Sequence, residues 1–424
     1  MKVIEIFKKI CSITHCSGKT DELKDYIKDF CENEGFFVEV DTVGNILCTK
    51  GNQVLCLQAH YDMVCIGKAP KVEVYEENGF LKAKNSSLGA DNGIGVALML
   101  YLSQIKNNIE LLFTNDEEIG MIGANGLNLK IKSKKILNLD TEEEGKVYIG
   151  CAGGIDVDAE KEYKRVPFKK DDEVYTLSIK DLQGGHSGVD IDKNIPNAIK
   201  ELGYYLAEFY PKIISINGGE MRNSIPKNVE ALIVVDKNFK FLPNKMVNIK
   251  KIQTNEKLYF ENSKEIIDMI CGFSNGVRRF DKKLGIPSIS VNLSKIQTLN
   301  DKIILQLFPR ANENEFLKKI KTEIKAYFEN LVYKVYFSHE YNAWKPEVNK
   351  FSEEVLEFCK NEFKNASFSA IHAGLECGIL LDKLGDDVFI ASIGPNIFYP
   401  HSIQEKCDIE SVERFSSIVE KIAR

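Results

Sequence analysis

The chain has 424 residues, 44% of them hydrophobic and 28% charged, which excludes a mini-protein, a fibrous protein and a disordered chain. Its 56 basic and 62 acidic residues give a net charge of −6, so it lacks the basic surplus that binds a phosphate backbone, and we expect no nucleic-acid partner. The longest apolar run, residues 95–102, is too short to span a bilayer, and the N-terminal residues are too charged for a signal peptide. We therefore expect a cytoplasmic protein without membrane association.

The first third of the chain shows alternating helix and strand patterns. Apolar periodicity predicts helices over residues 4–10 and 20–33 and a third, buried on most faces, over residues 92–104. Short apolar runs with strand character occur at residues 37–43, 45–49, 54–58, 110–113 and 135–139. This alternation favours an α/β domain with a mostly parallel sheet flanked by helices.

The pattern changes to a strand-rich one near residue 165. Strands are predicted at residues 174–182, 212–217, 229–235, 288–295, 302–307 and 332–337, and helices at 197–209, 263–273 and 313–328. Such a region is typical of an α+β layer, after which a helix at 347–363 and a strand at 388–393 return to the first pattern. We therefore predict a catalytic α/β domain, residues 1–168 and 343–424, interrupted by an inserted α+β lid domain, residues 169–342.

Eleven cysteines are scattered along the chain, with no CxxC pair among them. We interpret them as small core residues of a protein in a reducing compartment. A cysteine nucleophile or a cysteine zinc site is the alternative, but no spacing supports it.

Histidine and acidic residues follow the predicted strands of the first domain. The strand ends carry His60 with Asp62, Glu117 with Glu118, and Asp140, while Asp91 opens the buried helix. Two residues apart in an extended chain, His60 and Asp62 project to the same face, so the carboxylate can fix the imidazole tautomer for metal binding. Because ligands in open α/β sheets collect at the carboxyl ends of strands, we expect these residues to share one rim of the sheet.

Each of these groups has a simpler interpretation when taken alone. Asp91 or Asn92 could cap the helix, and acidic residues after strands often form solvated loops. Taken together, so many carboxylates at one rim would repel one another without a compensating cation. Imidazole and carboxylate ligands without cysteine suit catalytic zinc, with manganese or cobalt as substitutes.

Nine motifs occur in order over residues 43–402: VGNILCTK, LQAHYDMV, LGADNGIGVA, DEEIGMIGA, LDTEEEGKVYIGCAGGIDV, GGHSGVDI, GGEMRNSIP, IHAGLECG and ASIGPNIFYPHS. This set resembles the dizinc peptidase family that includes carnosinases, aminoacylases and succinyl-diaminopimelate desuccinylases, and within it the aminoacyl-histidine dipeptidases, or cytosol non-specific dipeptidases. The resemblance implies hydrolysis of unblocked dipeptides, of the Xaa-His type or with broad specificity. A deacylase of N-acyl amino acids or a tripeptidase on the same scaffold is the alternative.

The resemblance also implies a ligand set. Asp91 would bridge two zinc ions, with His60 and Asp140 completing one site and Glu118 and His401 the other. The ions would polarise the scissile carbonyl and activate a water molecule.

Further roles follow from the same resemblance. Glu117 would be the general base, and Asp62 would orient His60. His186 of the inserted domain would stabilise the oxyanion, and in relatives such a histidine can come from the other subunit, so we expect a homodimer.

Substrate-binding residues are implied as well. Arg222 and Asn223 resemble a substrate-binding pair, in which the Arg222 fork would take the terminal carboxylate of a peptide. His372, Gly374 and Glu376 match a loop that lines the catalytic pocket.

The sequence departs from the family pattern in two places. Residues 225–275 look shorter than in close relatives, and Cys65 stands where relatives tend to carry proline, with no evident chemical meaning. We interpret His15 and His339 as structural or surface residues and Arg310 as a solvated charge. From another class of function, a catalytically silent binding protein is the alternative, but the intact Glu117 argues against it.

Overall fold

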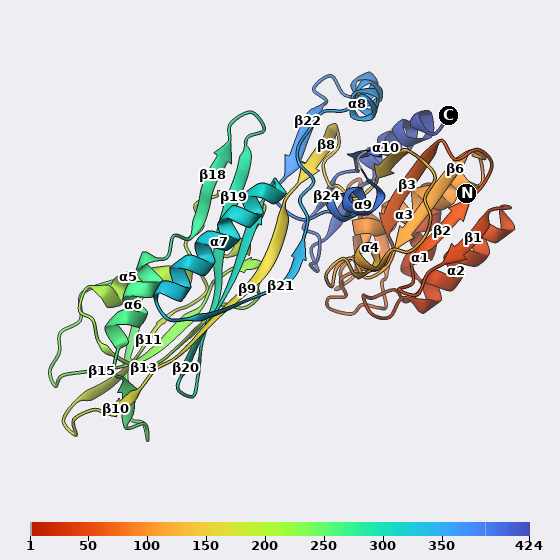
Figure 1. Cartoon of the computed structure of the whole chain (residues 1–424). Coiled ribbons are helices and arrows are strands. Elements are labelled where there is room, and N and C mark those ends of the chain that lie inside the picture. Colours follow the sequence, from red (N-terminus) through yellow and green to blue (C-terminus); the bar gives the residue numbers. More distant parts are fainter. Residues whose placement is uncertain (1, 386) are drawn as a thin grey trace. The chain divides into compact units, whose positions relative to one another are not determined.

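The computed structural model describes residues 2–385 and 387–424, which fall into two compact units (Figure 1). Unit 1 runs from the N-terminus to Cys151 and also contains Trp344–Ala370 and Leu375–Arg424, whereas unit 2 consists of Ala152–Ala343 and Ile371–Gly374. The chain therefore leaves one unit, builds the other and returns. The first boundary lies earlier than residue 168 because the strand Gly153–Glu162 (β9), whose charged residues alternate with apolar ones, already belongs to unit 2.

Unit 1 is built around an eight-stranded sheet with the strand order β1-β2-β6-β3-β7-β23-β8-β22. In that order, the strands are Phe37–Val40, Ile46–Thr49, Ile109–Thr114, Leu55–His60, Lys135–Asn138, Phe389–Ser392, Lys146–Cys151 and Ser367–Ile371. The four central strands β6, β3, β7 and β23 are parallel, while the β1–β2, β2–β6 and β23–β8 pairs are antiparallel. The sheet is thus parallel where the predicted site residues follow its strands, and antiparallel towards its edges.

Helices cover the sheet of unit 1. The helices are Val3–Cys11 (α1), Asp21–Asn33 (α2), Ala90–Ser103 (α3), Ile122–Gly126 (α4), Lys350–Glu362 (α8), Glu376–Leu384 (α9) and Ile409–Ile422 (α10). Residues of α1, α2, α3, α8 and α10 form one buried cluster with alternate strand residues, among them Leu57 and Ala59. The residue between these two, Gln58, points to the other face, where it bonds to the first residue of α9.

A second, four-stranded sheet in unit 1 has the order β24-β25-β5-β4. Its strands are Ile397–Phe398 (β24), Lys406–Asp408 (β25), Phe80–Ala83 (β5) and Val74–Glu77 (β4). The antiparallel pair β24–β25 encloses the segment that carries His401.

Unit 2 has a nine-stranded sheet in the order β16-β11-β15-β13-β19-β20-β9-β21, with β18 pairing β19. Apart from β9, these strands are Glu173–Ile179 (β11), Lys212–Gly218 (β13), Val229–Val235 (β15), Asn248–Lys251 (β16), Gly276–Asp281 (β18), Ile286–Leu299 (β19), Lys302–Ala311 (β20) and Lys334–Tyr341 (β21). The helices Ala198–Ala207 (α5), Ser263–Gly272 (α6) and Asn314–Asn330 (α7) pack into one apolar core with this sheet, as an α+β layer requires.

Two pairs of very short strands complete unit 2. Arg165–Pro167 (β10) pairs with Leu258–Phe260 (β17), and Gly185–His186 (β12) pairs with Ser224–Ile225 (β14). The second pair brings the predicted residues His186 and Asn223 close together, since Ser187 N donates to the Asn223 carbonyl over 2.8 Å.

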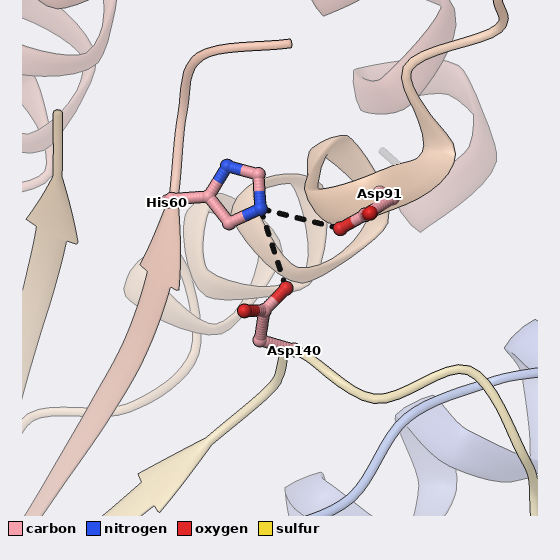
Figure 2. A group of neighbouring side chains, drawn as sticks. All are labelled: His60, Asp91 and Asp140. Atoms are coloured by element: carbon pink, nitrogen blue, oxygen red, sulfur yellow. Dashed lines mark hydrogen bonds and ion pairs between the residues drawn. The ribbon is translucent and has the colours of Figure 1, made fainter. Parts of the chain in front are cut away.

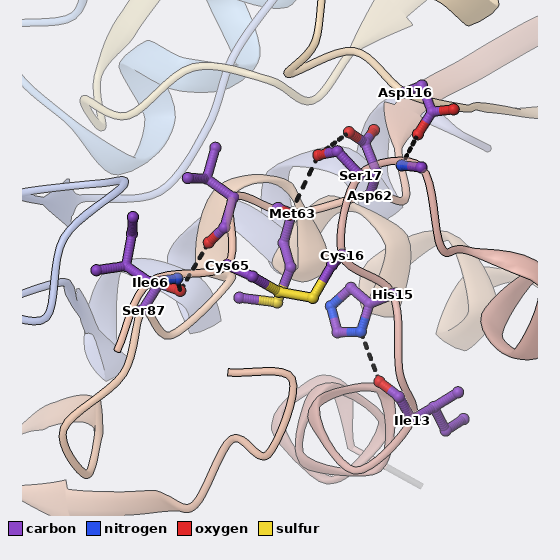
Figure 3. The surroundings of a disulfide bond; sticks show 12 residues. Ile13, His15, Cys16, Ser17, Asp62, Met63, Cys65, Ile66, Ser87 and Asp116 are labelled. Atoms are coloured by element: carbon purple, nitrogen blue, oxygen red, sulfur yellow. Dashed lines mark hydrogen bonds between the residues drawn. A yellow bond between two sulfur atoms is a disulfide. The ribbon is translucent and has the colours of Figure 1, made fainter. Parts of the chain in front are cut away.

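The prediction that every cysteine is a core thiol is wrong for two of them, because Cys16 and Cys65 form a disulfide (Figure 3). They lie in loops separated by 49 positions, a spacing that gives no signal in the sequence. In the described ranges the nine other cysteines form no disulfide, and eight of them are buried, as expected. No helix among the described residues is long and apolar enough to cross a membrane.

Candidate active site

The carboxyl end of β3 places His60 opposite two carboxylates of unit 1 (Figure 2). Its Nε2 lies 3.2 Å from Asp91 Oδ1 and 3.3 Å from Asp140 Oδ1. Its Nδ1 lies 3.0 Å from the Asp62 carbonyl oxygen, so Nδ1–H is the donor there and Nε2 carries the lone pair. A lone pair facing two carboxylates needs a proton or a cation between them, and this donor set therefore fits a metal ion.

Asp91 also faces a second group of ligands. Its Oδ2 lies 3.2 Å from His401 Nε2, which in turn lies 2.7 Å from Glu118 Oε1. In each of the groups His60–Asp91–Asp140 and Asp91–Glu118–His401, the candidate ligand atoms lie within 4.8 Å of one another. One oxygen of Asp91 thus points to each group, the geometry of a bridging carboxylate.

These side chains are not the solvated acidic loops of the simpler interpretation. The side chains of Asp140 and Glu118 are each 7% exposed and that of His60 only 1%. Burial raises the pKa of Asp140 to about 7, and burial also raises the pKa of Glu118. Among the described residues Asp91 does not cap the helix, because its two carboxylate oxygens face His60 and His401, and Ala90 N at the start of α3 donates to Glu405 instead.

Asp62 acts on the neighbouring loop as well as on His60. Its carboxylate accepts hydrogen bonds from Glu117 N over 2.9 Å, from Glu118 N over 3.3 Å and from Ser17 Oγ over 2.8 Å. Its Oδ1 lies 3.5 Å from His60 Nδ1, whereas the main-chain carbonyl oxygen of Asp62 lies 3.0 Å from the same nitrogen. The Asp62 side chain therefore fixes the segment after β6 that carries Glu117, whose pKa is raised by burial and then by the charge of Glu118.

Two further buried carboxylates bond to the segments that carry the candidate ligands. Glu376 is fully buried, and its Oε2 accepts from Gln58 Nε2 and Thr114 Oγ1, each over 2.6 Å. Burial raises the pKa of Glu376 to about 7, and the pKa of Glu405 is likewise raised by burial to about 7. The sequence analysis missed Glu405, which bonds to the backbone just before Asp91; the only signal was an acidic residue shortly after His401.

In unit 2, His186 lies beside a buried cation. Gly188 N and Val189 N both donate to His186 Nδ1 over 3.2 Å, so in the neutral ring Nε2 carries the proton. Arg310 Nη2 is 3.4 Å from this Nε2, and Arg310 is only 3% exposed, so the interpretation of Arg310 as a solvated charge is wrong. Its Nη1 donates to Tyr341 Oη over 2.8 Å, a contact made possible by the pairing of β20 and β21 with the same strand, β9.

His372 sits in a closed polar pocket of unit 2. Its Nδ1 lies 2.9 Å from Asn312 Oδ1 and its Nε2 lies 2.7 Å from Ser290 Oγ. Burial, followed by the charge of Arg310, lowers the pKa of His372 to about 3, so the ring is neutral. The segment that ends at Gly374 is held by Ala152 N, which donates to the carbonyls of residues 371 and 373.

Arg222 has partners within unit 2. Its Nη2 lies 3.1 Å from both carboxylate oxygens of Asp158, and its Nη1 donates to the Val157 carbonyl over 3.2 Å. Its Nε also lies 3.3 Å from Asp156 Oδ2. The fork that was predicted to take a substrate carboxylate is therefore already engaged by strand β9.

The chain is similar to known dipeptidases in sequence and in structure. The chain is 32% identical over 469 aligned residues to the cytosol non-specific dipeptidase of Escherichia coli (strain K12), covering 99% of this chain and 96% of the relative. The chain belongs to the cytosol non-specific dipeptidase family. The crystal structure of aminoacylhistidine dipeptidase from Vibrio alginolyticus aligns with this chain with a TM-score of 0.80 at 28% identity. The alignment covers 99% of this chain and 96% of that chain.

More distant comparisons support the fold. The profile of Peptidase family M28 matches residues 41–176, which include every predicted ligand except His401. A tripeptidase from Staphylococcus aureus aligns with a TM-score of 0.62 at 16% identity over 99% of this chain and 96% of its own. The fold is thus shared over 99% of the chain, and the M28 profile covers the part of the chain that contains His60, Asp91, Glu118 and Asp140.

Proposed function

We propose that this family member is a metal-dependent dipeptidase that hydrolyses the peptide bond of unblocked dipeptides. The observation that carries the proposal is the position of Asp91, with one oxygen towards the His60–Asp140 pair and the other towards the Glu118–His401 pair. The name of the relative at 32% identity, a non-specific dipeptidase, supports a dipeptide substrate.

The metal site is proposed to hold two zinc ions, with manganese or cobalt as substitutes. His60, Asp91 and Asp140 would hold one ion, and Asp91, Glu118 and His401 the other. When bound, such a pair of ions polarises the scissile carbonyl and lowers the pKa of water.

The protein residues supply proton transfer and orientation. Glu117, held by Asp62 through its backbone N–H, accepts a proton from the attacking water and passes it to the leaving amine. Burial already raises the pKa of Glu117, which favours a proton carrier. His186 is proposed to donate its Nε2 proton to the developing oxyanion, a role that suits the tautomer set by Gly188 N and Val189 N.

Substrate binding is proposed for Arg222, Asn223, His372, Gly374 and Glu376, in line with the family resemblance. Of these, Glu376 has one carboxylate oxygen bonded to β3 and β6, and its other oxygen has no hydrogen-bond partner among the residues that the structure describes. We further propose a homodimer in the cytoplasm, consistent with the cytosolic relative.

A substrate screen with metal analysis tests the proposal. Protein stripped with a chelator and reloaded with zinc, manganese or cobalt is assayed on unblocked dipeptides, on tripeptides and on N-acyl amino acids. Metal-restored cleavage of dipeptides is the expected result. A preference for N-acyl amino acids or tripeptides would show that dipeptides are not the substrate class. Undiminished activity after chelation would contradict the metal mechanism.

A further inference from the structure

The disulfide lies beside the residues that hold Asp62 (Figure 3). Cys16 is in the segment between α1 and α2, Cys65 is in the segment after β3, and their Cα atoms are 5.5 Å apart. The same two segments share backbone bonds, since Met63 N donates to the His15 carbonyl over 3.0 Å and Ser17 N donates to the Met63 carbonyl over 3.1 Å. The bridge therefore ties together two segments that are already paired.

The segment that follows Cys16 reaches Asp62 and also Asp116, which directly precedes the proposed base Glu117. Ser17 Oγ donates to Asp62 Oδ2 over 2.8 Å, and Gly18 N donates to Asp116 Oδ1 over 2.6 Å. Asp62 in turn holds the backbone N–H of Glu117. Without the disulfide, the Ser17 segment is held by hydrogen bonds alone, which weakens the support of the chain of bonds that ends at the proposed general base.

Both cysteines are open to reagents. Cys16 and Cys65 are each partly exposed, whereas among the nine other cysteines of the described ranges only Cys271 is not buried. In a reducing compartment, disulfides are usually transient and serve redox sensing or catalysis. An accessible pair next to the active site is therefore placed to exchange with small disulfides.

We propose that Cys16 and Cys65 form a reversible dithiol–disulfide site that adjusts the activity of unit 1. The proposal concerns the catalytic residues assigned above and in that respect rests on the proposed function. In the reaction, the thiolate of one cysteine attacks a low-molecular-weight disulfide RSSR, giving a mixed disulfide and RS⁻. The second thiolate displaces the other RS⁻, and the two protons lost by the cysteines leave as 2 RSH, so the protein is oxidised and RSSR is reduced.

The test equilibrates the whole protein with glutathione at different ratios of disulfide to thiol. Alkylation and peptide mass spectrometry then report the state of each cysteine, and kcat and the melting temperature are measured on the same samples. We expect Cys16 and Cys65 to interconvert together. The oxidised form should melt roughly 5 to 10 °C higher, because the bridge closes a long loop, and its kcat should be about threefold to tenfold higher, less than the effect of losing an outer partner of a metal ligand.

Variants separate this site from general thiol effects. Cys16→Ser and Cys65→Ser should each have the kcat of the reduced form at every glutathione ratio, whereas Cys271→Ser should respond as the unaltered protein does. Persistent alkylation of both cysteines at every ratio, or an equal redox response of kcat in Cys65→Ser, would overturn the proposal. The alkylation and melting results do not depend on the substrate. If the protein does not cleave dipeptides, these two measurements still show whether Cys16 and Cys65 interconvert.

A second inference rests on the buried carboxylate of Glu405, which is 3% exposed. Its Oε2 accepts from Leu88 N over 2.7 Å and from Gly89 N over 3.1 Å, and its Oε1 accepts from Ala90 N over 2.7 Å. These three N–H groups immediately precede Asp91. One side chain thus fixes the backbone from which the central carboxylate of the cluster projects.

Glu405 also belongs to the segment of His401. Its own N–H donates over 3.2 Å to the carbonyl of Ser402, the residue after His401. We infer that Glu405 is a positioning residue that sets the distance between Asp91 and His401, an inference that rests on the proposed metal site. Without this carboxylate, the two segments lose their common anchor and the ligands lose their fixed separation.

Glu405→Gln is the informative variant, because one of the two acceptor oxygens becomes an NH₂ group that faces one or two of the three N–H donors. Glu110 offers a matched control: it is fully buried, and its carboxylate accepts from the backbone N–H groups of Lys132 and Ser133 over 2.8 to 3.2 Å at the start of β6. Both variants remove a carboxylate that binds backbone N–H groups, but only Glu405 adjoins the ligands.

Cobalt titration followed by visible absorption gives a readout that does not depend on turnover. Glu405→Gln should bind cobalt about 10- to 100-fold more weakly and change its absorption spectrum, whereas Glu110→Gln should lower the melting temperature and keep the wild-type affinity and spectrum. Equal effects of both variants on cobalt binding would reduce Glu405 to a structural role. If neither the unaltered protein nor a variant binds cobalt, the proposed metal site itself fails.

Discussion

The two units gather charge of opposite sign at their functional residues. At the rim of the unit 1 sheet, Asp91, Glu118 and Asp140 converge on two imidazoles and are largely removed from water. In unit 2, His186 lies next to the buried guanidinium of Arg310. The first cluster needs cations to offset its repulsion, whereas the second suits an anion such as a carboxylate or a developing oxyanion.

The two clusters also differ in how the fold holds them. Four of the five candidate ligands of unit 1 follow parallel strands or begin a helix, where the backbone is fixed by a large core, and His401 lies between β24 and β25. His186 instead lies in β12, a two-residue strand paired only with β14. This difference suggests that rigid placement serves the metal ligands, while the residue proposed to meet the transition state is placed by local hydrogen bonds.

The largest expected effect comes from removing the carboxylate shared by both groups of ligands. Asp91→Ala should lose both metal ions and nearly all activity, because each group retains only one imidazole and one carboxylate. Elemental analysis of the purified variant checks this. A variant that keeps two ions per chain would show that Asp91 does not bridge them.

Changing the proposed base should separate chemistry from metal binding. Glu117→Gln should keep its metal ions and its melting temperature while kcat falls by roughly 10² to 10⁴, the usual contribution of an acid–base group. Glu117 N still donates to Asp62 in this variant, so the loop stays in place. Near-normal kcat would assign the proton transfer to another residue.

Four of the five proposed ligands could be located from the sequence pattern, because they follow a strand or start a helix. Strand periodicity located the ends of β3, β6 and β7, and the rule that ligands collect at the carboxyl ends of parallel strands then joined His60, Glu118 and Asp140. His401 and the individual roles came from the family resemblance, because no local pattern distinguishes its segment.

What the sequence did not reveal depends on contacts between distant segments. The Cys16–Cys65 bridge joins two loops without periodicity, and Glu405 meets residues 88–90 only after β25 pairs with β5. Strand β9 was missed because its charged residues, which face Arg222 and lysines, broke the apolar pattern. Arg310 was misread because an isolated arginine in a strand says nothing about its burial.

The unit 2 cluster is tested by His186→Ala, for which we expect kcat to fall by roughly 10² to 10³ with unchanged metal content. If His186 were only structural, His186→Ala would instead lower the melting temperature and leave kcat intact at low temperature.

The proposed dimer is tested by mixing subunits of the inactive Glu117→Gln and His186→Ala variants. Recovery of activity would mean that one chain supplies His186 to the other, and no recovery despite proven subunit exchange would mean that each chain supplies its own.

Without metal ions, the stability of the protein should depend on pH, because burying ionised carboxylates is unfavourable. Burial raises the pKa values of Asp140, Glu376 and Glu405 to about 7, so between pH 4 and 7 these carboxyls bind more protons in the folded than in the unfolded state and stability falls as pH rises. The buried histidines His15 and His372, whose pKa values are lowered, act in the opposite direction but are outnumbered by the three carboxyls. The lowered pKa values of Asp62 and Asp91 act below this range. The metal-free protein should therefore melt several degrees lower at pH 8 than at pH 5.5.

Metal binding should reverse that trend, because ions displace protons from their ligands and bind more tightly as pH rises. The zinc-loaded protein should thus melt at least as high at pH 8 as at pH 5.5, measured with and without a chelator. Parallel melting profiles in the two forms would mean that the acidic cluster of unit 1 is not a metal site.

The smallest expected effect concerns Arg222, proposed to bind the terminal carboxylate of the substrate. To do so, its guanidinium must give up part of its contact with Asp158. The net gain in binding free energy is therefore smaller than for a guanidinium without a carboxylate partner. Arg222→Gln should therefore raise KM for dipeptides by about tenfold, or about 1.4 kcal/mol, with little change in kcat. Dipeptide amides lack the carboxylate and provide the control, since their KM should be the same in both proteins. An equal rise in KM for acids and amides would assign Arg222 to holding β9 and the Asn223 segment together, and the carboxylate of the substrate would then need another cation.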